Sequence, residues 1–542
     1  MPRDRHVPVS DVSGERGARF ERRALLKAAG LAGLALVLPV RLRLSSLGLS
    51  GGQAFAAGRR RFRRRLPIPR VITDAQIEIP MRKAKVRLRG GRKTPMWTYG
   101  GSFPGPTIRR PAGEQTQVTF VHDLPTKAGE LTVHLHGGHN RSEDDGQPGG
   151  LTASQPKSLY CDISDRLSPK ESGNELLIPP GGRRTYTYDL IEGGAPERAA
   201  FQWYHDHRLD NTANNIWRGL AGMWIVDDEF DSSLPLPTGG RDLALMIAER
   251  TLNRRNRLTN PFKKEGHAPN DGVIGRCVLV NGAHLPHHHV TATRHRLRLL
   301  NASHFRAYNL QLGGGVKMTQ IATDAGLMPA PVERRRVLIG PGERVELIVD
   351  FKRFAGEHVV LRSVRRRGKK GRKRGSRAYE GPLMQFRVGK RKPDETSVPA
   401  TLRPLPDWVG EASPTPQRTW TLTVGSGLRP SWLINGRSFD PARSDAFPEL
   451  DTTETWELHN KTTVAHLIHM HHTDWYMLSR NGNEPRPWER CLKETFFLDP
   501  GDRVVVAGHF SDYTGKYVIH CHMLDHEDHG MMTQFEVVEP EP

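Results

Sequence analysis

Cysteine is scarce in this chain, which excludes a disulfide-stapled scaffold. The 542 residues contain four cysteines: Cys161, Cys277, Cys491 and Cys521. Small secreted domains held together by disulfides use many more per residue. An oxidising compartment would allow one bridge among the first three, but their spacing does not select a pair.

Long apolar runs and long helical periods are also missing. The apolar stretch from Ala28 to Val40 is shorter than the ~20 residues that a membrane-spanning helix needs. Nothing later in the chain could span a bilayer, so we expect no transmembrane segment. No long stretch repeats apolar residues with a helical period of 3.6, which argues against a helical bundle.

The amino terminus has the features of an export signal. Arg22-Arg23 precede the modest apolar stretch, and Ala54-Phe55-Ala56 provide an A-x-A cleavage site. This pattern resembles a twin-arginine signal over residues 1–56. It predicts export to the periplasm, the cell wall or the medium. Such signals carry folded proteins, often with a cofactor already bound.

Positive charge is concentrated in two runs. The net charge is +21, and residues 59–65 (RRRFRRR) and 365–374 (RRRGKKGRKR) carry much of the excess. Blocks of like charge are usually solvated, so we interpret 57–65 as a basic tail and the second run as a loop. The alternative is contact with an anionic surface such as nucleic acid, wall polymer or lipid. We expect no specific nucleic-acid partner.

What the chain does contain is short β-strand patterns. Apolar and polar residues alternate at 117–121, 344–349 and 503–506, and each run is bounded by Gly, Pro or Asn. One hydrophobic core stops growing near ~250–300 residues, so 542 residues predict several domains. The predicted fold class is all-β, built from sandwiches or barrels.

A Pro-x-Gly-acid turn before a strand recurs and suggests an internal repeat. It occurs at residues 111–114, 341–343 and 500–502. Three copies at wide spacing predict three sandwich units, at 66–230, 240–392 and 415–540. The joints fall at 232–240 and 399–416, which are rich in Pro, Gly or Ser.

Histidine carries the chemical information. Of 25 histidines, ten lie in four clusters near the two ends of the chain: His134 and His136; His205 and His207; His466, His469 and His471; His520, His522 and His526. The middle unit contributes none. Side chains two apart on a strand share a face, so each His-x-His pair presents two imidazoles to one point.

The last cluster is the most specific because Cys521 lies between His520 and His522. On a strand its thiolate points away from both imidazoles, so one backbone segment links two metal sites. A thiolate, two imidazoles and a weak thioether make a blue-copper centre. The set here would be His466, Cys521, His526 and Met531.

Eight imidazoles then remain in four His-x-His pairs. Neutral imidazole suits copper, and eight are enough for three ions held close together. Because reduction of O2 to water takes four electrons, a three-copper cluster plus a remote blue copper couples one-electron donors to that reaction.

These clusters, in this order, resemble the multicopper oxidase family of three cupredoxin domains. Supporting stretches are FPGPTI at 103–108, WYHDH at 203–207, GLAG at 219–222 and LING at 433–436. The resemblance covers nearly everything after residue 66 and implies three cupredoxin-like Greek-key β-sandwich domains. The chain is most similar to the branch of spore-coat laccase, bilirubin oxidase and phenoxazinone synthase.

The resemblance also implies residue roles for four copper ions. His134 and His469 would hold the type 2 copper. The type 3 pair would be held by six histidines: His136, His205, His207, His471, His520 and His522. Glu527 and Asp145 would relay the protons that O2 reduction consumes.

Some positions depart from the family pattern. Leu467 stands where the family has proline after the first histidine of the third cluster, so we expect altered loop stiffness with the ligands kept. His472, His529 and the run at 287–289 are extra, and we interpret that run as surface.

The predicted function is a laccase-like oxidase of phenolic, aminophenolic or bilirubin-like donors, which would reach the edge of His526. The alternative is a cuprous or other metal oxidase in envelope copper protection. It is disfavoured because the 13 methionines form no cluster beyond Met531-Met532. A copper-free envelope or division protein would lack the twelve ligands found here. Two-domain nitrite reductases lack the His-Cys-His bridge to a three-copper site.

Overall fold

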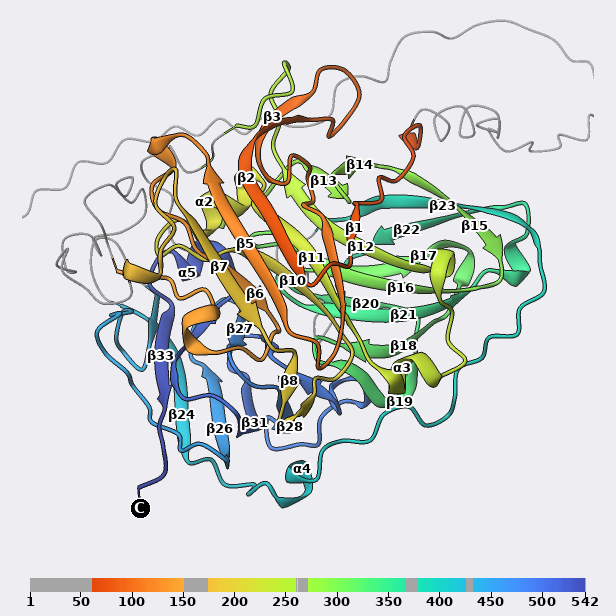
Figure 1. Cartoon of the computed structure of the whole chain (residues 1–542). Coiled ribbons are helices and arrows are strands. Elements are labelled where there is room, and N and C mark those ends of the chain that lie inside the picture. The colour runs from red at the N-terminus through yellow and green to blue at the C-terminus, as the bar shows by residue number, and fades with distance from the viewer. Residues whose placement is uncertain are drawn as a thin grey trace, which may run out of the picture. The chain divides into compact units, whose positions relative to one another are not determined.

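The computed structural model describes residues 61–150, 174–259, 261, 272–366, 379–425 and 432–541. The predicted export signal, Cys161 and residues 367–374 of the second basic run lie outside them. The described residues belong to one compact unit, Ala56–Pro542, and strands dominate it (Figure 1). In the part of the chain that the structure describes, no helix is long and apolar enough to cross a membrane.

The first sandwich packs a five-stranded sheet on a four-stranded one. The larger sheet has the order β1 (Val71–Ile72), β4 (Thr107–Pro111), β11 (Ala221–Asp227), β10 (Ala200–Asp206) and β6 (Val133–His136). The smaller has the order β3 (Thr94–Tyr99), β2 (Gln76–Val86), β5 (Thr116–Asp123) and β7 (Arg183–Tyr188). Every second side chain of β5 is buried, as the predicted alternation at 117–121 requires. A small ribbon, β8 (Ile191–Glu192) and β9 (Ala195–Pro196), follows β7.

The second sandwich packs seven strands on five. The larger sheet has the order β14 (Ala283–His284), β13 (Cys277–Val280), β12 (Asp242–Arg250), β16 (Arg294–Asn301), β21 (Arg344–Asp350), β18 (Met318–Thr323) and β19 (Gly326–Arg334). The smaller has the order β15 (His287–Ala292), β23 (Gly381–Arg391), β22 (His358–Ser363), β17 (Tyr308–Leu312) and β20 (Val337–Ile339).

The third sandwich packs six strands on four. The larger sheet has the order β25 (Trp432–Ile434), β24 (Arg418–Val424), β26 (Thr452–Asn460), β31 (Arg503–Phe510), β28 (Trp475–Arg480) and β29 (Leu492–Lys493). The smaller has the order β30 (Thr495–Leu498), β27 (His466–Met470), β32 (Gly515–Cys521) and β33 (Met532–Val537). These strand ranges support the domain limits 66–230, 240–392 and 415–540, which remain a prediction.

The described helices are short. The α-helices are α2 (Thr212–Arg218), α3 (Glu229–Ser233), α4 (Trp408–Glu411) and α5 (Leu524–Glu527). The 3-10 turns are η1 (Thr126–Ala128), η2 (Ser142–Asp144), η4 (Asn174–Leu176), η5 (Gly239–Arg241), η8 (Gly313–Gly315), η9 (Lys352–Phe354) and η11 (Pro487–Glu489). Of these, α5 carries His526 and Glu527.

The repeated turn is present, but not at all three predicted places. One parallel pair recurs at the same place in each sandwich: β2 with β5, β12 with β16 and β24 with β26. The second strand of each pair is followed in the sheet by an antiparallel neighbour: β7, β21 and β31. The turns before these neighbours contain Gly181, Gly342 and Gly501, each with φ of +81°, a conformation that favours glycine. The predicted turn at 111–114 precedes β5 instead, so the first copy is Pro180-Gly181.

The described part of the predicted basic tail, residues 61–65, is docked through its backbone, which corrects the solvated interpretation for that part. Arg65 forms a parallel bridge with His287, and the amide of His287 donates to Arg64 O at 2.7 Å. The Phe62 side chain is buried, while Arg63 and Arg65 are exposed.

Two other runs that the sequence places at the surface are only partly exposed. In the run at 287–289, His289 is exposed as predicted, but His287 is buried and His288 is half-buried. In the second basic run, both Nη atoms of Arg366 bond the carboxylate of Asp499, at 2.9 and 2.6 Å. That arginine is therefore a contact between the second and third sandwiches.

An ion pair between the buried His139 and the half-buried Asp512 joins the first and third sandwiches. Nε2 of His139 lies 3.0 Å from Oδ2 of Asp512, and Asp512 also accepts the amides of Gly193 and Gly194. Burial alone would lower the pKa of His139, but the hydrogen bond to Asp512, the charge of Glu192 and the bond to the His472 carbonyl together outweigh it and raise the pKa above its usual value. Burial would raise the pKa of Asp512, yet the same bond lowers it.

Asp512→Asn is expected to destabilise the protein by about 1.5–3 kcal/mol, with a marked pH dependence. The raised pKa of His139 makes its contribution full below about pH 6.5, and the contribution is lost as pH rises through the folded pKa. The lowered pKa of Asp512 makes its contribution present above about pH 4. The stability difference from wild type, measured by urea unfolding, should therefore be largest near pH 5–6 and shrink towards pH 9.

Asp189→Asn is the matched control, because Asp189 pairs with Arg141 at 2.7 Å and arginine does not titrate in this range. Its effect should be flat with pH. An Asp512→Asn effect that is also flat would contradict the ion-pair account.

Candidate metal centre

Strand pairing brings the histidine clusters opposite one another. In the first sandwich β6 pairs with β10, so that His134 faces His205 across the ladder. In the third sandwich β27 pairs with β32, so that His469 faces His520. Directly paired residues on neighbouring strands have Cβ atoms about 5 Å apart. Each sandwich therefore presents one compact histidine patch.

The two patches meet. Nε2 of His134 lies 3.4 Å from Nε2 of His469, and Nε2 of His207 lies 3.3 Å from Nε2 of His520. Three groups of three histidines have ligand atoms within 4.8 Å of one another: His136, His205 and His522; His207, His471 and His520; His134, His136 and His469. The eight predicted imidazoles thus lie together between the first and third sandwiches.

A fourth group surrounds Cys521. Its Sγ atom lies 3.5 Å from Nδ1 of His466 and 3.7 Å from Nδ1 of His526, and the two Nδ1 atoms are 3.1 Å apart. Met531 is fully buried in the same hydrophobic core as Cys521, and its carbonyl accepts the Cys521 amide at 3.0 Å. The predicted thiolate and thioether residues are neighbours.

The residues fit metal ions chemically. Every histidine in these groups is buried, and burial lowers the pKa of most of them, to about 3 for His207, His466 and His522 and well below the usual value for His136, His205, His469 and His471. They are therefore neutral, as metal ligands must be. Within the described part of the chain, His136 Nδ1, His205 Nε2 and both ring nitrogens of His522 have no hydrogen-bond partner.

Buried polar atoms normally have partners, so these free nitrogens in one group point to metal ions. Burial also raises the pKa of the Cys521 thiol to about 12. A bound cation would be needed to hold it as thiolate.

The two predicted acids contact these histidines. Asp145 is fully buried, and its Oδ2 lies 2.7 Å from Nδ1 of His471 while its Oδ1 lies 3.4 Å from Nδ1 of His134. Oε2 of Glu527 lies 2.9 Å from Nδ1 of His520. Burial would raise the pKa of Glu527, but the imidazoles of His520 and His207 outweigh it and lower the pKa. Both acids are placed to orient the ring nitrogens that they contact.

One expectation about access is wrong. The His526 imidazole is fully buried, so its edge is not open to a donor. Trp432 packs against it with ring centroids 4.3 Å apart, and Phe305 at 5.4 Å. Phe305 is half-buried and comes from the second sandwich.

Sequence reasoning missed several contacts of the site. Oγ1 of Thr462 lies 2.8 Å from Nε2 of His466, and Glu494 approaches His136. The extra His472 is buried, at 4.7 Å between ring centroids from His139. Glu494 follows Lys493 in an ordinary strand pattern, so only an alignment or a structure could single it out.

The described cysteines form no disulfide. Cys277, Cys491 and Cys521 are free and buried. A bridge between Cys277 and Cys491 is therefore ruled out.

The comparisons with known proteins agree with this geometry. Two family models, both described as multicopper oxidase, match residues 411–541 and 80–158. The chain is 29% identical to a laccase of Bacillus subtilis (strain 168), over 88% of this chain and 98% of the laccase. It is 30% identical to a bilirubin oxidase of Albifimbria verrucaria, over 81% of this chain and 72% of that enzyme.

A crystal structure of a multi-copper oxidase from Pediococcus acidilactici superposes with a TM-score of 0.72, at 26% identity, over 88% of this chain and 92% of that one. The three sandwiches are thus cupredoxin-like domains, and copper is the metal that the family implies for the histidine groups. The chain belongs to the multicopper oxidase family, as a laccase-like enzyme that couples oxidation of a substrate to the reduction of O2.

Proposed function

We propose that this enzyme oxidises phenolic, aminophenolic or bilirubin-like donors one electron at a time and reduces O2 fully to water with four copper ions. The single observation that carries the proposal is the segment His520-Cys521-His522. Cys521 belongs to one candidate metal group, while His520 and His522 belong to two others. Two peptide bonds therefore join the electron-accepting group to the oxygen-reducing one.

The proposed ligands follow the four groups. The type 1 copper would be held by His466, Cys521, His526 and Met531. The type 2 copper would be held by His134 and His469. The type 3 pair would be held by His136, His205 and His522 on one ion and by His207, His471 and His520 on the other. Copper bound there supplies one-electron redox chemistry and the reduction of O2.

The protein's own groups handle protons and orientation. Forming water from O2 consumes four protons at a buried site, so an acid must deliver them. Glu527, beside His520, and Asp145, between His134 and His471, are the proposed relays. Both carboxylates also fix the histidine rings they touch.

We expect donors to dock over Phe305 rather than on His526 itself. Phe305 is the half-buried ring next to the buried His526, so it offers an aromatic donor a stacking partner. Small anionic donors would also be favoured by the net charge. Contact of the basic runs with an anionic surface remains a proposal, as does export through the twin-arginine signal at residues 1–56.

The direct test is oxygen uptake by copper-loaded protein with 2,6-dimethoxyphenol. We expect four donor molecules oxidised for each O2, with no peroxide accumulating. Peroxide as the main product would overturn the proposal. Rapid oxygen uptake with cuprous ions but not with phenols would favour the metal-oxidase alternative.

Gly342→Ala is expected to disturb the type 3 site specifically. A Cβ atom at Gly342 would lie 2.8 Å from Cγ of the His522 ring, whereas one at Gly501 would meet nothing within 4 Å. Both glycines have φ of +81°, so both alanine variants should lose about 1–2 kcal/mol through backbone strain. Only Gly342→Ala should also weaken the near-ultraviolet absorption of the type 3 coppers. Equal spectra for the two variants would contradict the packing of Gly342 on His522.

A further inference from the structure

The second sandwich supplies no predicted copper ligand, yet one of its turns lies against the metal centre. The turn before β21 ends at Arg344, and Gly342 in that turn packs on the His522 ring. Arg344 packs so closely on Gly137, the residue after His136, that a Cβ atom there would collide with its guanidinium. Gly137 has φ of +90°. This part of the second sandwich therefore forms a wall of the histidine cluster.

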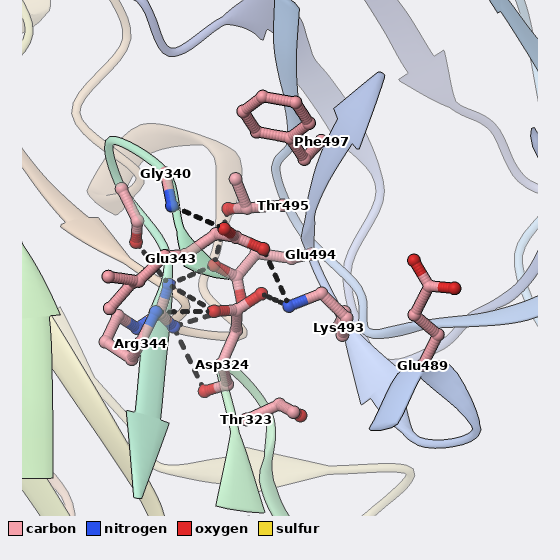
Figure 2. Close-up of polar contacts among 12 residues, drawn as sticks. Thr323, Asp324, Gly340, Glu343, Arg344, Glu489, Lys493, Glu494, Thr495 and Phe497 are labelled. Carbon is pink, nitrogen blue, oxygen red and sulfur yellow. Dashed lines mark hydrogen bonds and ion pairs between the residues drawn. The ribbon is translucent and has the colours of Figure 1, made fainter. Parts of the chain in front are cut away.

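Arg344 is fixed by many bonds in a fully buried position. Its Nε donates to Phe201 O at 2.8 Å, and its Nη2 donates to Asp324 O at 3.1 Å. Its two Nη atoms also donate to the carboxylate of Glu494. Nη1 donates to Oε1, and Nη2 donates to Oε2 at 3.0 Å. Figure 2 shows the guanidinium and this carboxylate facing each other. Such a bidentate pair fixes both the position and the plane of the carboxylate.

Glu494 in turn contacts two candidate ligands. Its Oε1 lies 3.0 Å from Nε2 of His136. Its backbone oxygen lies 3.2 Å from Nδ1 of His469. Nε2 of His136 also lies 3.4 Å from Oγ1 of Thr495, whose hydroxyl donates to Glu494 Oε1 at 3.1 Å. Both oxygens near Nε2 therefore accept, so His136 carries its proton on Nε2. Nδ1 of His136, which has no partner among the described residues, is then left with its lone pair.

A second layer of charges holds this arrangement. Nζ of Lys493 lies 2.7 Å from Oδ2 of Asp324 and 3.3 Å from Oε1 of Glu343, and Asp324 Oδ1 accepts the Arg344 amide at 2.7 Å. Figure 2 shows Lys493 reaching Asp324 beside the Arg344 and Glu494 pair. Burying so many charges costs desolvation energy and is weak evidence for stability. Because Glu494 lies beside His136 and His469, this network of charges can instead fix the orientation of two candidate metal ligands.

We propose that Arg344 and Glu494 are positioning residues of the three-copper site: Arg344 clamps the Glu494 carboxylate onto Nε2 of His136, which presents Nδ1 of His136 to copper. The second sandwich thereby contributes to the metal centre through a residue that binds no metal. This inference rests on the proposed copper-binding role of His136.

The test compares three variants of the full-length, copper-loaded protein. Glu494→Gln keeps the shape of the side chain but removes the charge, and Arg344→Lys keeps the charge but removes the bidentate grip. Glu346→Gln is the control, because Glu346 is another buried carboxylate, on the same strand β21, held by Arg296 and Arg298 at 2.5 and 2.7 Å. Copper content, resistance to a chelator, the type 2 electron paramagnetic resonance signal and type 3 absorption are measured in each.

Loss of a partner that orients a metal-binding histidine typically costs 10–100-fold in metal affinity. We therefore expect Glu494→Gln to lose copper from the three-copper site 10–100-fold more readily, with altered type 2 and type 3 signals and an unchanged blue absorption. Arg344→Lys should show the same change to a smaller degree. Glu346→Gln should keep the wild-type spectra.

Wild-type spectra and copper retention in both Glu494→Gln and Arg344→Lys would overturn the inference. If Glu494→Gln does not fold, the signals of Arg344→Lys decide alone: altered type 2 and type 3 signals support the inference, and unchanged signals overturn it. A wild-type protein that binds no copper would instead overturn the proposed function.

Discussion

Replacing Cys521 with serine is expected to abolish the blue absorption of the copper-loaded protein and to reduce oxygen uptake with phenolic donors to background. The blue colour requires a thiolate ligand, and a serine hydroxyl does not provide one. Cys521 is also the residue through which electrons pass to His520 and His522, so turnover should stop even though the three-copper histidines are intact. The visible spectrum and an oxygen electrode check both effects.

Cys491→Ser is the matched control, since Cys491 is a second buried free thiol of the third sandwich and belongs to none of the metal groups found among the described residues. It should keep the colour and the activity and lose some stability. A Cys521→Ser protein that still turns blue would show that another residue provides the thiolate. Retained oxygen uptake would show that electrons bypass this segment.

Glu527→Gln is expected to lower turnover about 10²–10⁴-fold, the usual effect of removing a positioned proton donor. Glutamine keeps the size of the side chain and loses its ability to deliver a proton. The blue copper should still be reduced by the donor at the wild-type rate, because the carboxylate of Glu527 lies against His520 and His207 of the histidine cluster. Stopped-flow bleaching of the blue band and steady-state oxygen uptake separate the two steps.

Asp525→Asn provides the comparison on the same short helix. Asp525 is buried and accepts the Val273 amide at 2.8 Å, so its replacement should reduce stability with little effect on turnover. Turnover of Glu527→Gln at the wild-type rate would remove Glu527 from the proton path. An equal loss in Asp525→Asn would indicate a general disturbance of α5.

The parts of the fold and site that follow a local period could be predicted from the sequence. The alternation of apolar and polar residues identified the strands that became β5, β21 and β31, although the side chains of β21 are buried on both faces up to Ile348 and Val349. The same two-residue period predicted that Cys521 and its neighbours His520 and His522 face different sites, and the structure has them in different candidate groups. These features depend only on which way a strand side chain points.

Features set by contacts between distant strands could not be predicted. The similar turns at 111–114 and 341–343 look equivalent as sequence, yet sheet pairing makes Gly181 the counterpart of Gly342. The docking of Arg65 on His287 and the covering of His526 by Phe305 join segments more than 200 residues apart. The sequence indicates for Arg344 only a place in a strand, because its partner Glu494 lies 150 residues away.

The most direct test of the central claim is anomalous X-ray scattering at the copper edge from crystals of the copper-loaded protein. The account predicts one copper between Cys521, His466 and His526, and three coppers among the eight remaining histidines. Absence of a peak at Cys521, or a single peak in place of three among the histidines, would contradict it.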